Sequence, residues 1–519
     1  MFRFPALALW VGFLLSLIPA TPRADADERP LFEARAFGAN GDGMTKDTAA
    51  LQGAIDAANA AGGGIVSLDK GRFLSGTLII KSGVTLRIEK GAILLGSTEH
   101  ADYRKNRWLA LLEARGQSKI KVTGGGVIDG QGRELAADVL RLVLAKQIVD
   151  PMTSNRPAEV NRPEIIEFVD CKDVTVRDVT LKDSACWVET YYNCEHVTLD
   201  HVTVRSTASW NNDGLDLADD RHVVVKDCDI DSDDDGICLK SGAAKGCDDI
   251  LIENCRVRSS ASALKFGTSS RGAFRHITVR GLQVHDTFRA AIALESVDGA
   301  VIENVDISDV VAKNTGAAIF LRLGNRNKEG QPGALRDVTI HDVTVEVPSG
   351  HPDEGYEHAG PEPKGAHNLF PSSITGLPGF PVSNVTLKNI TITHAGGGKR
   401  DRAEVPLSSL EKVPEQADRY PEFSMFGELP AWGFYCRHAA GITFENVTLR
   451  CADKDYRAAL VCDDVEKLTL DGLHVQSAGD EPVIVLHGVK GAVIRNSPPL
   501  AGAKRFLDAQ AGTTNVRQE

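Results

Sequence analysis

The sequence predicts an all-β fold, a right-handed parallel β-helix (a solenoid) with a short capping helix near its N-terminus. A phrase of alternating β-branched residues recurs with spacings of 23, 26, 27 and 27 residues, beginning at Val174, Val197, Val223, Ile250 and Ile277. Alternation indicates strands, and a fixed period in the twenties indicates stacked repeats. Aromatic residues make up only 6% of the chain while glycines number 49, which suits thin layers filled by small side chains.

Each phrase consists of two alternating pieces joined by a polar pair, such as Arg177-Asp178, which marks a bend. Leucine-rich repeats share the period, but their L-x-x-L-x-L consensus is absent. The phrase returns at Val301, Val338, Val385, Ile442, Leu468 and Val493. The longer spacings among these predict loop insertions near 346–383 and 393–440. We expect these loops to frame a groove beside the solenoid and to decide whether the protein acts within chains or at their ends.

The first 26 residues have the pattern of a secretory signal peptide. Arg3 is followed by an apolar run over 4–20 and by the small-x-small site Ala24-Asp25-Ala26. The alternative is a membrane anchor, against which the short run and its two prolines argue. We therefore expect a secreted or periplasmic protein that has no membrane contact after removal of the signal, with residues 27–519 forming a single β-helix domain.

One helix is predicted between the signal and the first strands. Thr48, Leu51, Ile55 and Ala58 follow a helical period within 45–61, and three glycines at 62–64 end it. Solenoids need such a terminal cap to cover the first coil.

Composition excludes several classes of function. Lys and Arg total 58 against 71 Asp and Glu, so the net charge is −13, which argues against a nucleic-acid partner. The ten cysteines contain no C-x-x-C pair, which argues against a zinc ribbon. Cys171, Cys228 and Cys255 fall at similar places in successive repeats, and both disulfides and stacked buried thiols remain open interpretations.

Two segments contain more acidic residues than the strand pattern explains. They are Asn211-Asn-Asp-Gly-Leu-Asp216 and Ser232-Asp-Asp-Asp-Gly-Ile-Cys-Leu-Lys-Ser-Gly242. Asp213 lies 21 and 22 residues before Asp234 and Asp235, nearly one coil, and neighbouring strands are about 4.8 Å apart. The three carboxylates therefore share one surface, where their charges separate their pKa values. A glycosidase uses this pattern, one acid for the leaving oxygen and one carboxylate for water.

Four other interpretations compete with this one. Asp-Gly pairs are common in turns, and a row of acids can be merely solvated. The stretch 231–236 matches the start of an EF-hand loop, but the twelfth position is Gly242 rather than Glu. A calcium site of another kind, as in a pectate lyase, is the remaining alternative.

The two acidic segments resemble glycoside hydrolase family 28, the polygalacturonase-like enzymes, which share Asn-Thr-Asp-Gly-x-Asp and Asp-Asp-Cys-x-Ala-x-Lys-Ser-Gly motifs. Supporting stretches are Phe37-Gly-Ala-Asn-Gly-Asp-Gly43, Gly125–Gly132, Arg162-Pro163 and Ser184–Trp187, so the resemblance covers roughly 33–345. It implies that Asp234 is the general acid, that Asp213 and Asp235 activate water, that the configuration is inverted and that no metal or cofactor is needed. It also implies substrate contacts from three residues of the same motifs, Asn211, Asp216 and Lys240.

Two departures from the family pattern stand in the following coils. Ser262 takes the place of the family's histidine, and Ala293 and Glu295 replace the arginine and lysine that bind a uronate carboxylate. Lys265, Glu295 and Arg322 are 30 and 27 residues apart, about one coil each. They are expected either to contact the substrate or to form a structural ion-pair ladder. Trp187, Tyr191 and Tyr192 are either a sugar-stacking platform or packing residues.

The sequence thus predicts an exported, monomeric hydrolase of pectic polysaccharide. Without the usual basic clamp, the expected substrate is rhamnogalacturonan or another pectic glycan less uniformly acidic than homogalacturonan. The alternatives are a calcium-dependent polysaccharide lyase on the same fold and a non-catalytic β-helix that binds glycans.

Overall fold

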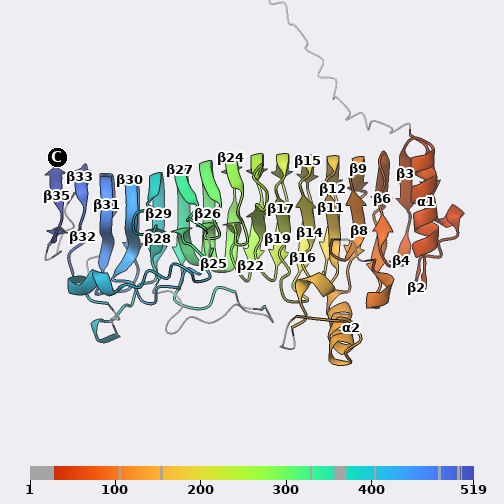
Figure 1. The fold of residues 1–519 in the computed structure, drawn as a ribbon, viewed down its shortest axis with the longest axis horizontal. Coiled ribbons are helices and arrows are strands. Elements are labelled where there is room, and N and C mark those ends of the chain that lie inside the picture. The colour runs from red at the N-terminus through yellow and green to blue at the C-terminus, as the bar shows by residue number, and fades with distance from the viewer. Residues whose placement is uncertain are drawn as a thin grey trace, which may run out of the picture.

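The computed structural model describes residues 29–104, 107–151, 156–327, 330–353, 355–356, 370–402, 405–476, 481–498, 503 and 505–519. The predicted signal peptide, residues 1–26, lies outside them. The described chain is an all-β stack of parallel strands that advances from α1 at one end to β35 at the other (Figure 1). In the part of the chain described, no helix is long and apolar enough to cross a membrane.

The strands pair in three parallel faces, and several long strands bend from one face to the next. The first face contains β5 (Leu78–Ile79), β8 (Ala110–Arg115), β11 (Glu164–Val169), β14 (Glu189–Tyr192), β17 (Leu215–Ala218), β20 (Ile237–Lys240), β23 (Leu264–Phe266), β28 (Ser372–Thr375), β32 (Ile484–His487) and β34 (Leu507–Ala509). The second face contains β1 (Leu31–Glu33), β3 (Gly64–Leu68), β6 (Val84–Ile88), β9 (Ser118–Thr123), β12 (Lys172–Arg177), β15 (Glu195–Asp200), β18 (Arg221–Lys226), β21 (Cys247–Glu253), β24 (Ala273–Arg280), β33 (Lys490–Arg495) and β35 (Thr514–Gln518). The third face contains β2 (Asp42–Lys46), β4 (Gly71–Ser75), β7 (Ala92–Gly96), β10 (Val127–Asp129), β13 (Thr180–Lys182), β16 (Thr203–Ser206), β19 (Asp229–Ser232) and β22 (Arg256–Ser259).

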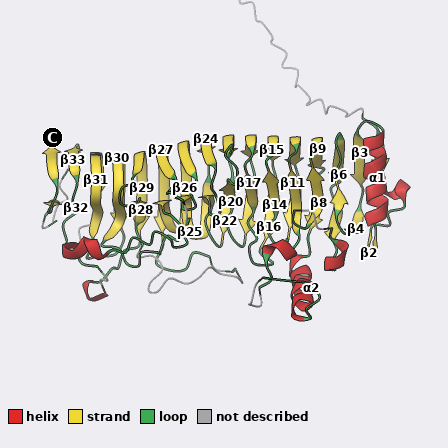
Figure 2. Cartoon of the chain, viewed as in Figure 1, coloured by secondary structure: helices red, strands yellow, loops and turns green. Residues whose placement is uncertain are grey.

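The long strands and the helices complete the fold. The bending strands are β25 (Gln283–Ser296), β26 (Val301–Leu323), β27 (Ala334–Val347), β29 (Val382–His394), β30 (Ala431–Cys451) and β31 (Ala458–Val475). The helices are α1 (Thr48–Ala60), α2 (Gly132–Leu144) and the 3₁₀ turns η1 (Ala34–Phe37), η2 (His100–Asp102), η3 (Glu159–Asn161), η5 (Arg400–Arg402) and η6 (Leu407–Lys412). Figure 2 shows that α2, η5 and η6 project from the same side of the strand stack.

The repeated phrase stacks in register on the second face. Val174 opposes Val197, which opposes Val223, and the row continues through Ile250 and Ile277. These side chains are at most 1% exposed, so each coil adds one buried aliphatic layer to a continuous core.

Further along, the predicted phrase starts need correction. Ile277 opposes Val305 rather than Val301, and Leu468 opposes Ala492 rather than Val493. Val301, the first residue of β26, instead opposes Ala273, the first residue of β24. The core residue of β26 is Val305, and the apolar pair Val301-Ile302 precedes it in the same strand.

The polar pairs within the phrases mark sharp bends between the second and third faces. Asp178, His201, Asp227 and Asn254, each the second residue of a pair, have φ values of 53°, 53°, 54° and 55°. Short polar side chains tolerate this left-handed conformation, which explains why Asp, Asn and His recur there.

The ten cysteines are all free thiols, and nine of them are buried. Cys436 and Cys462 are direct partners in adjacent strands, so the thiols stack as small apolar side chains.

Helix α1 lies at the N-terminal end of the stack, against β1, β3, β5 and β6 (Figure 1). It buries Leu51, Ala54, Ile55 and Ala58, each 0% exposed. The predicted helix over 45–61 is therefore observed over Thr48–Ala60.

Candidate active site

Three carboxylates converge where the chain enters two neighbouring strands of the first face. Asp213 stands two residues before β17, and Asp235 stands two residues before β20. These strands pair with Leu215 opposite Ile237, and the Gly214 N–H donates to the Asp235 carbonyl over 2.8 Å. One oxygen each from Asp213, Asp234 and Asp235 lie within 4.8 Å of one another. The predicted convergence of the three acids is thus what the structure shows.

The glycine after each acid lets these turns approach closely. A Cβ on Gly214 would meet the Gly236 carbonyl oxygen at 2.7 Å, and one on Gly236 would meet the Ala263 carbonyl oxygen at 2.8 Å. Any side chain would therefore push the coils apart, so the two Asp-Gly pairs of the sequence set the spacing of the carboxylates.

Two lysines, Lys265 buried and Lys240 partly buried, balance this acidic charge. The Lys265 Nζ lies 2.7 Å from Asp235 Oδ2, and both side chains are 3% exposed. The Lys240 Nζ lies 2.8 Å from Asp216 Oδ1 and 3.3 Å from Asp213 Oδ2. Each lysine therefore neutralises a different side of the cluster, which favours different protonation states for its members.

The surroundings separate the pKa values of these acids. Burial, together with the charges of Asp216 and Asp234, raises the pKa of Asp213 well above its usual value. Burial raises the pKa of Asp216 to about 6, although Lys240 opposes the shift. Burial also acts to raise the pKa of Asp235, but Lys265 and other nearby cations outweigh it and leave that pKa below its usual value. The cluster therefore retains a proton near Asp213 while Asp235 is ionised.

The loop before β17 is fixed by Arg162, which is fully buried. Its guanidinium donates to the carbonyl oxygens of Pro157 and Ala185 over 2.9 Å each, and to Asn211 Oδ1 over 2.7 Å. The Asn211 Nδ2 in turn donates to Asp234 Oδ2 over 3.5 Å. A buried arginine thus links the turn that carries Asn211 to Asp234, the most exposed member of the acid cluster.

Around the acids the structure has a cavity of about 630 Å³. Of the predicted substrate contacts, Asn211, Lys240 and Lys265 line it. Asp216 and Glu295 lie behind its wall, 0% and 3% exposed. They contact the lysines rather than the cavity: Asp216 pairs with Lys240, and Glu295 Oε2 is 4.0 Å from Lys265 Nζ. Burial raises the pKa of Glu295 to about 8.

Arg322 does not lie at the cavity, although it was predicted as a substrate contact. It does oppose Glu295 in the strand register. Its guanidinium, however, donates to the carbonyl oxygens of Gly376 at 3.1 Å and of Glu415 at 2.7 Å, and its side chain is 1% exposed and absent from the cavity wall. The coil spacing was predicted correctly, but the segment before β30 folds over this position and takes up the arginine's hydrogen bonds.

The sequence-based prediction missed several cavity residues. Arg107, Trp108, Arg156, Arg289 and Tyr420 line the cavity. Most of them stand on loops without a repeating pattern, so periodicity gave no signal for them. They change the expected charge, because the sequence predicted the loss of a basic clamp, whereas the cavity wall contains five cations: Arg107, Arg156, Lys240, Lys265 and Arg289.

Tyr420 and Glu422 bring the second predicted insertion, near 393–440, to the cavity. The Lys265 Nζ donates to Tyr420 Oη over 3.1 Å, and Arg289 Nε lies 3.0 Å from Glu422 Oε2. The first insertion, near 346–383, contributes Tyr356, whose hydroxyl donates to Asp231 Oδ1 over 2.6 Å outside the cavity wall. One of the two insertions therefore borders the acids, as the prediction required.

The aromatic residues divide between cavity and core. Trp187 and Tyr192 line the cavity, and the Trp187 ring lies 4.6 Å from that of Trp108. Tyr191 is fully buried, with its hydroxyl donating to Glu189 Oε2 over 2.7 Å. Trp187 and Tyr192 are therefore accessible from the cavity, whereas Tyr191 packs in the core, because successive side chains of a strand point to opposite faces.

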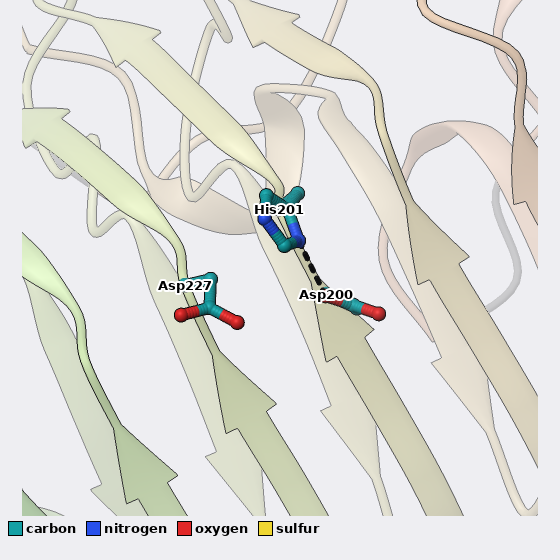
Figure 3. A group of neighbouring side chains, drawn as sticks. All are labelled: Asp200, His201 and Asp227. Carbon is teal, nitrogen blue, oxygen red and sulfur yellow. Dashed lines mark hydrogen bonds and ion pairs between the residues drawn. The ribbon is translucent and has the colours of Figure 1, made fainter. Parts of the chain in front are cut away.

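A second group of potential metal ligands lies on the bends between the second and third faces. Figure 3 shows Asp200 and His201 joined through Nδ1 at 2.6 Å, with Asp227 on the adjacent bend. Lys226 also pairs with Asp200, at 3.4 Å, so this group is a surface ion-pair cluster, and we assign it no function.

Comparisons with known proteins agree with this geometry. A Vitis vinifera protein described as a probable polygalacturonase is 23% identical over 403 residues, covering 70% of this chain and 74% of that protein. An exo-poly-alpha-D-galacturonosidase from Dickeya chrysanthemi is 22% identical over 425 residues, covering 68% and 70%. A hyperthermoactive exopolygalacturonase from Thermotoga maritima shares the fold with a TM-score of 0.56 at 20% identity, covering 70% of this chain and 87% of that one. The model of the glycosyl hydrolases family 28 matches residues 65–356. With more than half its length matched, the chain belongs to family 28 of the glycosyl hydrolases and is a polygalacturonase-like glycoside hydrolase.

Proposed function

We propose that the protein is an exported enzyme that hydrolyses α-glycosidic bonds in pectic polysaccharide, with Asp213, Asp234 and Asp235 as its catalytic acids. The observation that carries this proposal is the cluster of three carboxylates in one cavity, in which Lys265 keeps Asp235 ionised while Asp213 retains a proton. Hydrolysis needs both states at once, a carboxylate to receive a proton from water and an acid to supply one to the leaving oxygen.

The roles follow from position. Asp234 is the most exposed of the three acids and lines the cavity, so it delivers the proton to the glycosidic oxygen as the bond from that oxygen to the anomeric carbon breaks. Asp235 accepts a proton from the water whose oxygen bonds to the anomeric carbon. Asp213 lies beside Asp234 in the cluster and helps to hold the water.

Inversion is the expected stereochemical outcome. The nearest carboxylate oxygens lie within 4.8 Å, closer than the separation of about 6.5–9.5 Å usual between the carboxyl groups of inverting enzymes. Inversion is nevertheless proposed, because the resemblance to family 28 implies it and gives Asp235 the role of a base that activates water. Proton NMR of the anomer formed first tests this: a retained configuration would overturn the assigned role of Asp235.

Hydrolysis is favoured over calcium-dependent elimination by the two lysines. Lys265 and Lys240 occupy oxygens of Asp235 and Asp213 that a calcium ion would need as ligands. A hydrolase requires no such ion, and its products carry no unsaturated, ultraviolet-absorbing end.

The five cations of the cavity make a galacturonate-rich chain the first substrate to test, with rhamnogalacturonan second. We propose that the enzyme acts at chain ends, because Tyr420 and Glu422 stand beside Lys265 and Arg289 on one side of the acids. The names of the Dickeya and Thermotoga relatives describe enzymes of this exo type.

Export, a single domain, the monomeric state and a capping role for α1 are parts of the same proposal. The apolar run at 4–20 supports a cleaved signal, and the buried face of α1 against the first strands supports a cap. Sequencing the N-terminus of the protein recovered outside the cytoplasm tests the first of these, with a start at Asp27 expected.

The decisive experiment is a screen of defined glycans with the wild type and with Asp234→Asn. We expect wild-type hydrolysis of polygalacturonate that is lost in the variant. Calcium-dependent unsaturated products would support the lyase instead, and binding without any product would support a non-catalytic glycan-binding protein.

A further inference from the structure

The end of the cavity nearest the N-terminus is built from residues outside the acidic motifs. Arg107 and Trp108 precede β8, and they meet Trp187 and Tyr192 beside β14. Together they form a wall that is both aromatic and cationic, on the opposite side of the catalytic acids from Tyr420.

Arg107 is held in place by rings. Its guanidinium carbon lies 4.2 Å from the centre of the Tyr192 ring and 5.5 Å from that of Trp108. Stacking between aromatic rings fixes the guanidinium plane without using its N–H groups. An arginine positioned in this way has guanidinium N–H groups that can donate hydrogen bonds to a ligand.

Glu167, the acid that pairs with Arg107, does not use those donors fully. Arg107 Nη1 lies 3.6 Å from Glu167 Oε1, and this nitrogen has no hydrogen-bond partner among the described residues. Glu167 is fully buried, and burial raises its pKa although Arg107 opposes the shift. The side chain of Arg107 is 31% exposed and lines the cavity, whereas its Nη1 is turned inward and buried.

The aromatic part of the wall continues to the catalytic acids. Trp108 lies 4.6 Å from Trp187, and the Lys240 Nζ lies 4.5 Å above the Trp187 ring while also contacting Asp213 at 3.3 Å. A sugar beside the scissile bond would therefore meet an aromatic surface on one side and a cation at its edge.

We propose that Arg107, with Trp108, Trp187 and Tyr192, forms a subsite for the carboxylate and ring face of an acidic sugar next to the bond that is cleaved. This inference rests on the proposed hydrolytic function and adds the substrate class on this side of the acids.

Cations then stand on both sides of the acids. Thr190, which precedes Tyr192 in β14, opposes Asp216 in the next strand. Asp216 in turn opposes Cys238, and Cys238 opposes Lys265. These three strand spacings amount to about 14 Å along the stack. A chain with acidic sugars on both sides of the scissile bond fits this arrangement, whereas one in which acidic and neutral sugars alternate leaves one cation unpaired.

The test compares Arg107→Gln with Arg107→Lys and with Arg115→Gln. Arg115 is the matched control, because it stands on the same coil but pairs with Asp170 at 3.9 Å outside the cavity wall. Steady-state rates are measured with trigalacturonate and with its methyl ester, and binding of trigalacturonate is measured by calorimetry in an Asp234→Asn background. Thermal unfolding of each variant confirms that it is folded.

For Arg107→Gln we expect kcat/KM on trigalacturonate to fall about tenfold to a hundredfold, mainly through KM, with the dissociation constant rising equally. On the methyl ester the variant should match the wild type. Arg107→Lys should recover part of the loss, and Arg115→Gln should show none.

Equal values of KM and of the dissociation constant for Arg107→Gln and Arg115→Gln would overturn the subsite while leaving hydrolysis intact. Loss of rate on both substrates alike would overturn it too, since a carboxylate contact must distinguish acid from ester. A wild type that binds trigalacturonate through Arg107 without cleaving it would instead refute the proposed function alone.

Discussion

The Lys265 ammonium lies 2.7 Å from Asp235 Oδ2, and the two side chains, each 3% exposed, form a buried ion pair at the base of the cavity. Ser262, at the position where the resemblance to family 28 implies a histidine, reaches Asp235 only through its backbone N–H, at 3.2 Å from Oδ1. A permanent cation therefore stands beside this carboxylate, in place of a group that titrates near neutral pH.

The first prediction concerns Lys265→Met. Without the ammonium, burial dominates and the pKa of Asp235 rises, so the acidic limb of kcat/KM should move to higher pH by about one to three units. The maximal rate should fall as well. The pH profile measures both, and Lys226→Met, on a surface lysine that pairs with Asp200, is the control. An unmoved acidic limb would contradict the role of Lys265.

The second prediction concerns the acids. Asp234→Asn and Asp235→Asn should each lower kcat by about 10²–10⁴-fold, as expected when a general acid or base is removed. Asp231→Asn is the matched control, because Asp231 pairs with Arg258 and Tyr356 rather than with the cluster. Turnover of Asp234→Asn above a tenth of the wild-type value would reject its assigned role.

Glu295 gives a third prediction. Because burial raises its pKa to about 8, its side chain is protonated during turnover at pH 5–7, and glutamine imitates that state. Glu295→Gln should therefore keep kcat within about threefold of the wild type in this range. Glu295→Lys, which places a second cation near Lys265, should lose most activity. A large loss in Glu295→Gln would show that the ionised carboxylate is needed.

The fourth prediction links pH to stability through Glu189. Burial raises the pKa of Glu189 in the folded protein to about 8 from the ordinary 4.5. Between these values the folded state holds a proton that the unfolded state releases, so the free energy of unfolding should fall as pH rises, by up to about 1.4 kcal/mol per pH unit. Urea unfolding from pH 5 to pH 8 should show a flatter dependence for Glu189→Gln. An identical slope would exclude Glu189 as a source.

The fifth prediction concerns product length. If Tyr420 closes the cavity beyond Lys265, then Tyr420→Ala should release longer products from oligogalacturonides in addition to the shortest ones. Chromatography of early products measures this. Tyr356→Ala removes an equal ring from the other insertion and should leave the pattern unchanged. Random internal cleavage by the wild type would contradict end-wise action.

The fold and the acid cluster could be predicted because each rests on periodic information. One buried aliphatic layer per coil fixes the stack, and the interval from Asp213 to Asp235 equals the strand register. Arg107 and Tyr420 could not be predicted, since loop positions depend on long-range packing that has no period. Arg322 was misplaced for the same reason: its register was correct, but the segment that covers it was not predictable.

The strict strand register has a practical consequence for engineering. Inserting one residue within a strand would reverse the inward and outward alternation of everything after it on that face, so coil interiors tolerate substitutions but not changes of length. The connections after β10, β27 and β29 carry no such constraint. Redesign of the range of accepted glycans is therefore best confined to those connections, where length can vary while the reactive carboxylates remain in place.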